Sequence, residues 1–306
     1  MFTLAHLSDP HLGPLPKGAV RRNFALKRSI GAINWRLNRH RAHDPAVAQA
    51  IADDIRAAAP DHVALTGDIV NVSAYDEFPA AASWLRSFGP SNWISFVPGN
   101  HDAYVRCDWE YGLGHLADYM TGDMRVNTAT TTPQIATPFP YVRLRRNIAL
   151  IGLSSAVPQP IGRATGVLGA AQLSTLAELL PDLRQRGYAR VIMIHHPPLP
   201  GLAQPRHDLL DAAALRDVLA EHGAELVLHG HNHKPTHTEL ETRFGTAHIF
   251  GVPSASFARR EHHAPAAWNL YRIARTSGRW HIDVSTRSFD PVHRTITTIK
   301  DLGIAA

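Results

Sequence analysis

The chain places side chains that can bind metal ions directly after several apolar, strand-like runs. The first case is the stretch "LSDPHLG", in which Asp9 and His11 follow the run "FTLAHL". Comparable endings recur downstream at Gly67-Asp68, Gly99-Asn100-His101-Asp102, His195-His196-Pro197 and Gly230-His231-Asn232-His233. Carboxylate, imidazole and amide groups offer nitrogen and oxygen ligands. One ion would use few of them, whereas two adjacent ions that share a carboxylate would use most.

The runs that must position these groups alternate with helical patterns, which predicts an α/β fold. Loops at the carboxyl ends of neighbouring strands in such a sheet converge on one crevice. The segment "HDPAVAQAIADDIRAAAP" predicts a helix, because Asp44 can cap it and Val47, Ile51 and Ile55 would line one face. The tail segments "AHIFGV", "AWNLYRIA" and "WHIDVST" alternate regularly, which predicts antiparallel strands in a second sheet.

Taken in order, the five endings resemble the motif set of the calcineurin-like metallophosphoesterase superfamily: D-x-H, G-D, G-N-H-[DE], H and G-H-x-H. The elements "GNHD" and "GHNH" make the resemblance specific. It implies a four-layer α-β-β-α sandwich with two mixed sheets, formed by one domain over residues 1–306, with metals at one rim. Within the superfamily, the compact spacing and the "HHPP" and "GHNH" elements are most similar to the bacterial class III cyclic nucleotide phosphodiesterases and their relatives.

The resemblance also implies a role for each residue. The first metal would be held by Asp9, His11 and His233, and the second by Asn100, His195 and His231. Asp68 would bridge the two metals, and His101 would contact the substrate. The cofactors would be two divalent or trivalent ions, with manganese or iron favoured and zinc or magnesium also compatible with these ligands. The implied reaction is hydrolysis of a phosphodiester by a hydroxide that bridges the metals, with His101 stabilising phosphoryl charge or protonating the leaving group.

Other functions are compatible with the same motifs. A phosphomonoesterase or a lipid-linked pyrophosphate hydrolase would use the same centre on a different phosphate ester. A non-catalytic scaffold on this fold, as in a retromer subunit, would have no need to keep Asp68 together with His101. A nucleic-acid-binding or membrane-binding module would use a basic segment of the chain, and its metal centre would be incidental.

Several residues beside the motifs have structural as well as functional interpretations. His196 is expected to line the site, because the family motif His-x-Pro selects His195 as the ligand. Asp102 could orient a neighbouring histidine or cap its own loop. His229 is expected on the opposite face of its strand from the site. Ordinary surface or core positions are expected for His237, His248, His262 and His263.

A strongly basic insert occupies residues 14–43, with eight Lys or Arg and no acidic residue, whereas the remainder has 23 basic and 26 acidic residues. Within it, Leu26, Ile30, Ile33 and Leu37 share one helical face. The favoured interpretation is an amphipathic helix that packs this face on the domain and leaves a basic face solvated. Alternatively, the helix overhangs the metals, and the segment Arg21–Arg41 contacts an anionic partner such as a nucleotide, a nucleic-acid end or a membrane lipid headgroup.

The amino-acid composition and the first residues of the chain indicate a cytoplasmic protein. Cys107 is the single cysteine, so no internal disulfide can form, which fits a reducing compartment. The first residues show no signal-peptide pattern, and no apolar run reaches the roughly 20 residues that a membrane span needs.

Overall fold

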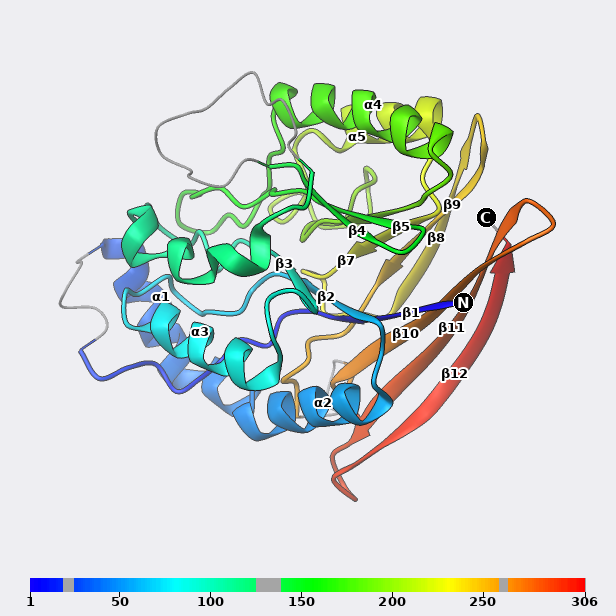
Figure 1. Ribbon diagram of the computed structural model, residues 1–306. Coiled ribbons are helices and arrows are strands. Elements are labelled where there is room, and N and C mark those ends of the chain that lie inside the picture. Colours follow the sequence, from blue (N-terminus) through cyan, green and yellow to red (C-terminus); the bar gives the residue numbers. More distant parts are fainter. Residues whose placement is uncertain (19–24, 125–138, 259–263, 306) are drawn as a thin grey trace.

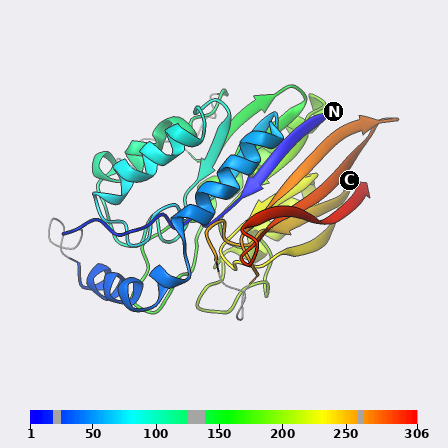
Figure 2. The same cartoon turned by 90° about the horizontal axis from the view of Figure 1, so that it is seen from below.

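Two six-stranded sheets face each other and carry helices on their outer sides (Figure 1). The computed structural model describes residues 1–18, 25–124, 139–258 and 264–305. The first sheet is covered by α2 (Pro45–Ala58) and α3 (Glu77–Phe88), which run side by side in the view from below (Figure 2). The second sheet is covered by α4 (Ala170–Gln185) and α5 (Ala212–His222). This order of layers confirms the predicted α-β-β-α sandwich.

The first sheet combines strands from both ends of the chain. In spatial order its strands are β12 (Thr295–Ala305), β11 (Arg279–Asp290), β10 (Ala267–Thr276), β1 (Phe2–Leu7), β2 (His62–Thr66) and β3 (Ile94–Val97). The last three run parallel to one another, so their carboxyl ends lie at one edge. The tail strands β10 and β11 pair antiparallel as predicted, but their assignment to a separate sheet is wrong, because β10 also pairs antiparallel with β1, with Tyr271 opposite Leu4. Alternation indicates a half-buried strand but does not identify its partner.

The second sheet is also mixed. In spatial order its strands are β4 (Tyr141–Arg145), β5 (Ile148–Gly152), β6 (Ala189–Met193), β7 (Leu226–His229), β9 (Gly245–Gly251) and β8 (Thr236–Thr242). The four strands β5, β6, β7 and β9 are parallel, and β4 and β8 add antiparallel edges. The tail strand β9 lies in this second sheet and pairs antiparallel with β8, as predicted, but on its other side it pairs in parallel with β7.

Helix α2 forms as the sequence predicts. The Asp44 carboxylate accepts a hydrogen bond from the Ala46 amide at 2.9 Å, and Val47, Ile51 and Ile55 are fully buried. These side chains belong to a large apolar core that includes residues of both sheets and of α2 and α3. A second apolar cluster fills the space between the second sheet and the helices α4 and α5. Short 3₁₀ helices span Arg39–Arg41, Trp109–Tyr111 and Leu113–Met120. None of the helices in the described ranges is long and apolar enough to cross a membrane.

The basic insert contains helix α1 (Leu26–Leu37), but the favoured prediction of its orientation is wrong. The apolar stripe from Leu26 to Leu37 is exposed, and the buried positions are Arg28, Gly31, Ala32 and Trp35. The Arg28 guanidinium donates to the backbone carbonyls of Val72 and Ser73, at 3.2 and 2.8 Å. Periodicity finds the two faces of a helix, but here the specific partners of a buried arginine decide which face turns inward. The insert positions Arg21 and Arg22 lie outside the described residues.

Candidate metal centre

Five loops meet where the parallel strands end, three from the first sheet and two from the second. The Asp9 amide donates to the Gly67 carbonyl at 3.0 Å, which ties the loop after β1 to the loop after β2. Across the sandwich, the Nδ1 nitrogen of His195 lies 2.7 Å from the Thr66 carbonyl oxygen, so its N–H donates to the end of β2. The Gly230 amide donates to the His195 carbonyl at 3.0 Å. These bonds fix the loops of both sheets against one another.

One set of side chains combines the loops after β1 and β7. The Nε2 nitrogen of His233 lies 3.1 Å from Oδ1 of Asp9 and 3.3 Å from Nε2 of His11. The same His11 nitrogen is 3.9 Å from that Asp9 oxygen. Asp9 and His11 are buried, and His233 is partly exposed. The structure thus brings together the three residues that the sequence assigns to the first metal.

A second set combines the loops after β3, β6 and β7. The Nε2 nitrogen of His195 lies 3.1 Å from Oδ1 of Asn100 and 3.2 Å from Nδ1 of His231. His195 is fully buried, and Asn100 is nearly so. The three residues that the sequence assigns to the second metal are therefore also neighbours in space.

Asp68 lies between the two sets. Its Oδ2 oxygen is 3.8 Å from Nε2 of His11 and 3.4 Å from Nε2 of His195, so one carboxylate faces an imidazole of each set. Its Oδ1 oxygen accepts the His101 backbone N–H at 2.7 Å. Burial alone would raise the pKa of Asp68, but His195 and His101 lower that pKa well below the usual range. A carboxylate in this place can share its charge between two cations.

The donor atoms fit metal ions. Four of the donor-to-donor distances within the two sets are 3.1–3.3 Å, which is the spacing expected between ligands that approach one ion at roughly 2.0–2.2 Å. Left-handed backbone angles occur at five of the seven assigned ligands, Asp9, His11, Asp68, His231 and His233. Such angles cost about 1–3 kcal/mol each and cluster where function requires them. At Gly99 a Cβ atom would lie 2.6 Å from the Asp68 amide nitrogen, so only glycine lets this loop approach Asp68.

The histidines differ in protonation. Burial, followed by the charges of Arg39 and His43, lowers the pKa of His11, which leaves its lone pair available to a metal near pH 7. Burial and the neighbouring His196 and His195 lower the pKa of His231 in the same way. Burial also disfavours the charged form of His195, but the adjacent Asp68 carboxylate outweighs it and raises the pKa of His195 to about 9. A cation that binds there must displace a proton from His195.

His101 lies beside these two sets but belongs to none of the metal-binding groups found in the described residues. Its Nδ1 nitrogen is 2.5 Å from the Asn71 carbonyl oxygen, to which its N–H donates. The Tyr104 ring stacks on the imidazole, with centroids 5.4 Å apart and planes 10° from parallel. His101 thus lies outside both ligand sets, while its separation from the metals and its role toward a substrate stay predictions.

Two further residues reach the site without being singled out by the motifs. His43 is buried, its ring centroid lies 4.5 Å from that of His11, and its Nδ1 is 2.8 Å from the Ser256 hydroxyl. A metal could also be held by His11, His43 and His233. Arg39 comes from the basic insert, and its guanidinium nitrogens lie 3.0 Å from Nε2 of His101 and 3.1 Å from Nε2 of His11. The absence of acidic residues in the insert was the one sequence signal for Arg39, and nothing in the sequence distinguished His43.

The structure shows the contacts of three residues that the sequence left with more than one interpretation: Asp102, His196 and His229. The Asp102 carboxylate accepts backbone N–H groups from Asp68, Ile69, Val70 and Gly99, so it caps the loops. His196 uses both ring nitrogens on Ser155 and on the Ala164 carbonyl, and its ring centroid is 4.4 Å from that of His231, which confirms a lining position. The Nδ1 nitrogen of His229 lies 3.1 Å from the Gly230 carbonyl oxygen.

A separate group lies on the β8–β9 hairpin. His237, Glu239 and His248 bring ligand atoms within 4.8 Å of one another. The expectation of ordinary surface or core positions fits their burial, since His248 is buried and His237 partly exposed. His262 and His263 lie outside the described residues.

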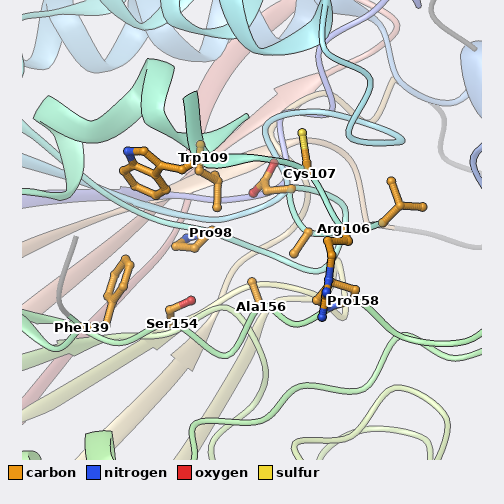
Figure 3. Close-up of a pocket in the computed structure, with 12 residues that line it drawn as sticks. Pro98, Arg106, Cys107, Trp109, Phe139, Ser154, Ala156 and Pro158 are labelled. Atoms are coloured by element: carbon orange, nitrogen blue, oxygen red, sulfur yellow. The ribbon is translucent and has the colours of Figure 1, made fainter. Parts of the chain in front are cut away.

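A mostly apolar cavity of about 210 Å³ borders the loop that carries Asn100 and His101 (Figure 3). Pro98 and Asp102 of this loop contribute to one wall. Trp109, Phe139 and Pro158 are among the apolar residues that line it, and Arg106 adds a cationic side chain. The loop that carries the candidate ligand Asn100 therefore also borders an apolar cavity.

Comparison with solved structures shows the same fold in two phosphatases and a sulfate thiohydrolase. A dimetal phosphatase from Danio rerio is 15% identical, with a TM-score of 0.64 over 99% of this chain and 98% of that one. A purple acid phosphatase from Lupinus luteus is 10% identical, with a TM-score of 0.55 over 99% of this chain and 53% of that one. A sulfate thiohydrolase from Thermus thermophilus is 16% identical, with a TM-score of 0.52 over 99% of this chain and 56% of that one. These similarities establish the fold.

Among curated proteins the sequence has no match. The family model for calcineurin-like phosphoesterases, in contrast, matches residues 2–235. The match includes every strand end described above, from the loop after β1 to the loop after β7. The chain therefore belongs to the calcineurin-like phosphoesterase family.

Proposed function

We propose that the protein is a metal-dependent hydrolase of phosphodiesters. The observation that carries the proposal is the placement of one buried carboxylate, Asp68, between two sets of nitrogen and oxygen ligands. In this proposal Asp9, His11 and His233 hold one ion, and a further set of Asn100, His195 and His231 holds the other. Family membership supports a phosphate ester as the substrate.

The two ions, when bound, supply an activated water and neutralise negative charge on the phosphoryl oxygens. The protein's own groups arrange the rest of the reaction. The Nδ1–H of His101 donates to the Asn71 carbonyl, and Nε2 faces the Arg39 guanidinium at 3.0 Å, so a substrate oxygen would meet Nε2 in place of that contact. The Asp68 carboxylate holds the His101 backbone through its Oδ1 atom. His101 is thus positioned to interact with the leaving group or with a phosphoryl oxygen while it stays off the ions.

Arg39 extends this site toward an anionic substrate. Arg39 is partly exposed, and its guanidinium contacts the imidazoles of His11 and His101. Burial of the guanidinium lowers the pKa of Arg39, although Asp68 and Asp9 favour its charged form. A guanidinium remains charged in proteins and binds phosphate through two parallel N–H donors. We infer that Arg39 binds a non-bridging oxygen of the substrate phosphate, so the basic insert belongs to the substrate site.

Arg39→Ala is expected to lower kcat/KM for a phosphodiester by about 10²-fold, because one preorganised donor is lost from the phosphate site. Arg39→Lys should recover part of this loss, since it restores the charge without the planar fork. Steady-state kinetics and metal analysis of the same preparations provide the test. Arg36→Ala, an exposed arginine on the same insert, is the matched control. Unchanged kcat/KM in Arg39→Ala would remove Arg39 from the site.

An activity screen of the purified, metal-analysed protein tests the proposed reaction. The panel should contain cyclic nucleotides, nucleotide diesters, glycerophosphodiesters, lipid-linked pyrophosphates and phosphomonoesters. We expect the highest kcat/KM on a diester. A clear preference for monoesters would replace the proposal with a phosphomonoesterase, and metal binding without turnover of any ester would favour a scaffold.

We propose manganese or iron as the ions, since both accept mixed imidazole and carboxylate ligands, as zinc and magnesium also do. Elemental analysis of protein purified without added metal identifies them. A cytoplasmic location is proposed from the free, half-buried Cys107. The single-domain organisation over residues 1–306 is likewise a proposal, supported by the family match to residues 2–235.

A further inference from the structure

Helix α1 exposes a continuous apolar stripe. The exposed fractions of its four large aliphatic side chains are 63% for Leu26, 43% for Ile30, 55% for Ile33 and 64% for Leu37. Their spacing of three or four residues places them on one face of the helix. Single exposed apolar side chains are normal on a protein surface, but a stripe of four marks an interaction site.

Specific contacts on the opposite side prevent this stripe from turning inward. A Cβ atom at Gly31 would lie 2.8 Å from the Tyr104 ring, so the helix backbone lies directly against that ring. Trp35 packs in a small cluster with Leu15, Ala32 and Val72. Together with the hydrogen bonds from Arg28 to two backbone carbonyls, these contacts orient the helix. The apolar stripe is therefore presented outward by a fixed support.

The charges around the stripe select its partner. No acidic residue occurs between positions 25 and 43, and two arginines are exposed here, Arg36 on α1 and Arg41 on the 3₁₀ helix that follows it. A second copy of the chain would bring two basic helices together, which like-charge repulsion disfavours. A nucleic acid offers phosphates but no apolar layer for four aliphatic side chains. An anionic lipid surface offers both, because headgroup phosphates lie directly above the acyl region.

The stripe is also connected to the metal site. Arg39, which touches His11 and His101, follows the end of α1 by two residues. Both views place α1 at the end of the molecule opposite the C-terminal strands, so neither β11 nor β12 covers it (Figures 1 and 2). Tyr104 links the two features physically, since it packs against Gly31 and stacks on His101. A surface that receives α1 lies next to the site where the phosphate ester would react.

We propose that α1 docks on an anionic phospholipid surface, with Leu26, Ile30, Ile33 and Leu37 at the boundary between headgroups and acyl chains, and that the substrate is a phosphate ester of a membrane lipid. The second part rests on the proposed function, whereas the docking itself does not require turnover. Hydrolysis would then occur at the lipid headgroup, with the guanidinium of Arg39 on the phosphate.

Vesicle co-sedimentation with the full-length chain tests the docking. The probes are vesicles of phosphatidylcholine alone and of phosphatidylcholine with phosphatidylglycerol. We expect at least 10-fold tighter binding to the anionic vesicles. Ile33→Gln combined with Leu37→Gln should weaken that binding at least 10-fold, since glutamine keeps the helix but removes the apolar contact. Arg36→Gln combined with Arg41→Gln should remove most of the preference for anionic lipid.

A matched control replaces exposed apolar residues elsewhere. Val292 and Ile299 are 70% and 63% exposed, and Val292→Gln combined with Ile299→Gln should bind vesicles like the parent. Equal binding to neutral and anionic vesicles, or no binding, would overturn the proposal. Light scattering that shows a dimer dissociated by Ile33→Gln and Leu37→Gln would instead assign the stripe to a second copy, and DNA binding lost in the same variant would assign it to nucleic acid.

The design separates the docking from the proposed function. Vesicle binding is measured without turnover, and hydrolysis of the water-soluble diester bis(p-nitrophenyl) phosphate is measured without vesicles. Failure of the first with success of the second rejects the lipid surface and keeps the hydrolase. Asp68→Ala should bind vesicles normally, because Asp68 is 2% exposed and lies in the loop after β2, outside α1. Parallel loss of vesicle binding in that variant would contradict the independence of the two sites.

Discussion

Asp68→Ala is expected to lose both metal ions and hydrolytic activity together. The Asp68 carboxylate is the group that faces an imidazole of each ligand set, so its removal leaves two dications without a shared counter-charge. We expect fewer than one ion per chain to remain after gel filtration. Hydrolysis of bis(p-nitrophenyl) phosphate should fall by at least ~10³-fold. When catalytic residues act as a unit, removing one of them costs nearly as much activity as removing all of them.

Two further variants make this result specific. Asp68→Asn keeps the volume and an oxygen for the His101 backbone N–H, so it isolates the lost charge, and we expect almost the same loss of metal. Asp61→Ala removes a half-buried carboxylate that accepts from Thr3 at another edge of the first sheet, and it should keep metal and activity. Melting curves show whether each variant is folded. Hydrolysis at the parental rate by folded Asp68→Ala would disprove the two-metal account.

His101→Ala should keep both ions and turn over slowly. The imidazole of His101 belongs to neither ligand set, and its loss leaves the seven assigned ligands in place. General acid or charge-stabilising groups contribute typically about 10²–10⁴-fold, so kcat should fall by that factor with little change in metal content. Steady-state kinetics give kcat and KM, and elemental analysis of the same sample gives the metal content.

The leaving group refines the test of His101. If His101 protonates the leaving oxygen, the loss in His101→Ala should shrink for a good leaving group such as p-nitrophenolate and grow for an alkoxide. His115→Ala, a histidine on the 3₁₀ helix Leu113–Met120, serves as the matched control and should leave kcat unchanged. A His101→Ala protein that loses one ion would reassign this residue from substrate contact to metal ligand.

The strand ends were predictable because each is marked by a local pattern. An apolar run followed by Asp, Asn or His, with a glycine before these residues at three of the five ends, identifies both the element and the group that it positions, and parallel pairing then brings the groups to one edge. Asp9, Asp68 and His195 meet for this reason. The resemblance to a known motif set supplied the division into two ligand sets, which spacing alone left open.

The other features depend on contacts between residues far apart in the chain. The tail strands alternate as expected, yet whether β10 pairs with β1 or within a separate sheet is decided by the packing of two faces. Helix α1 shows its two faces in sequence, but its orientation follows from hydrogen bonds between Arg28 and carbonyls some 45 residues away. His43 and Arg39 also reach the site through contacts with residues far away in the sequence. The basic composition of the insert was a signal for Arg39, whereas no local pattern marks His43.

The central claim is that two ions lie side by side at the ends of the parallel strands, joined by Asp68. Anomalous diffraction from crystals grown with manganese tests it most directly. The account predicts two anomalous peaks roughly 3.5–4 Å apart, one against Asp9, His11 and His233 and the other against Asn100, His195 and His231. A single peak, an empty rim, or imidazoles turned away from one another would contradict it.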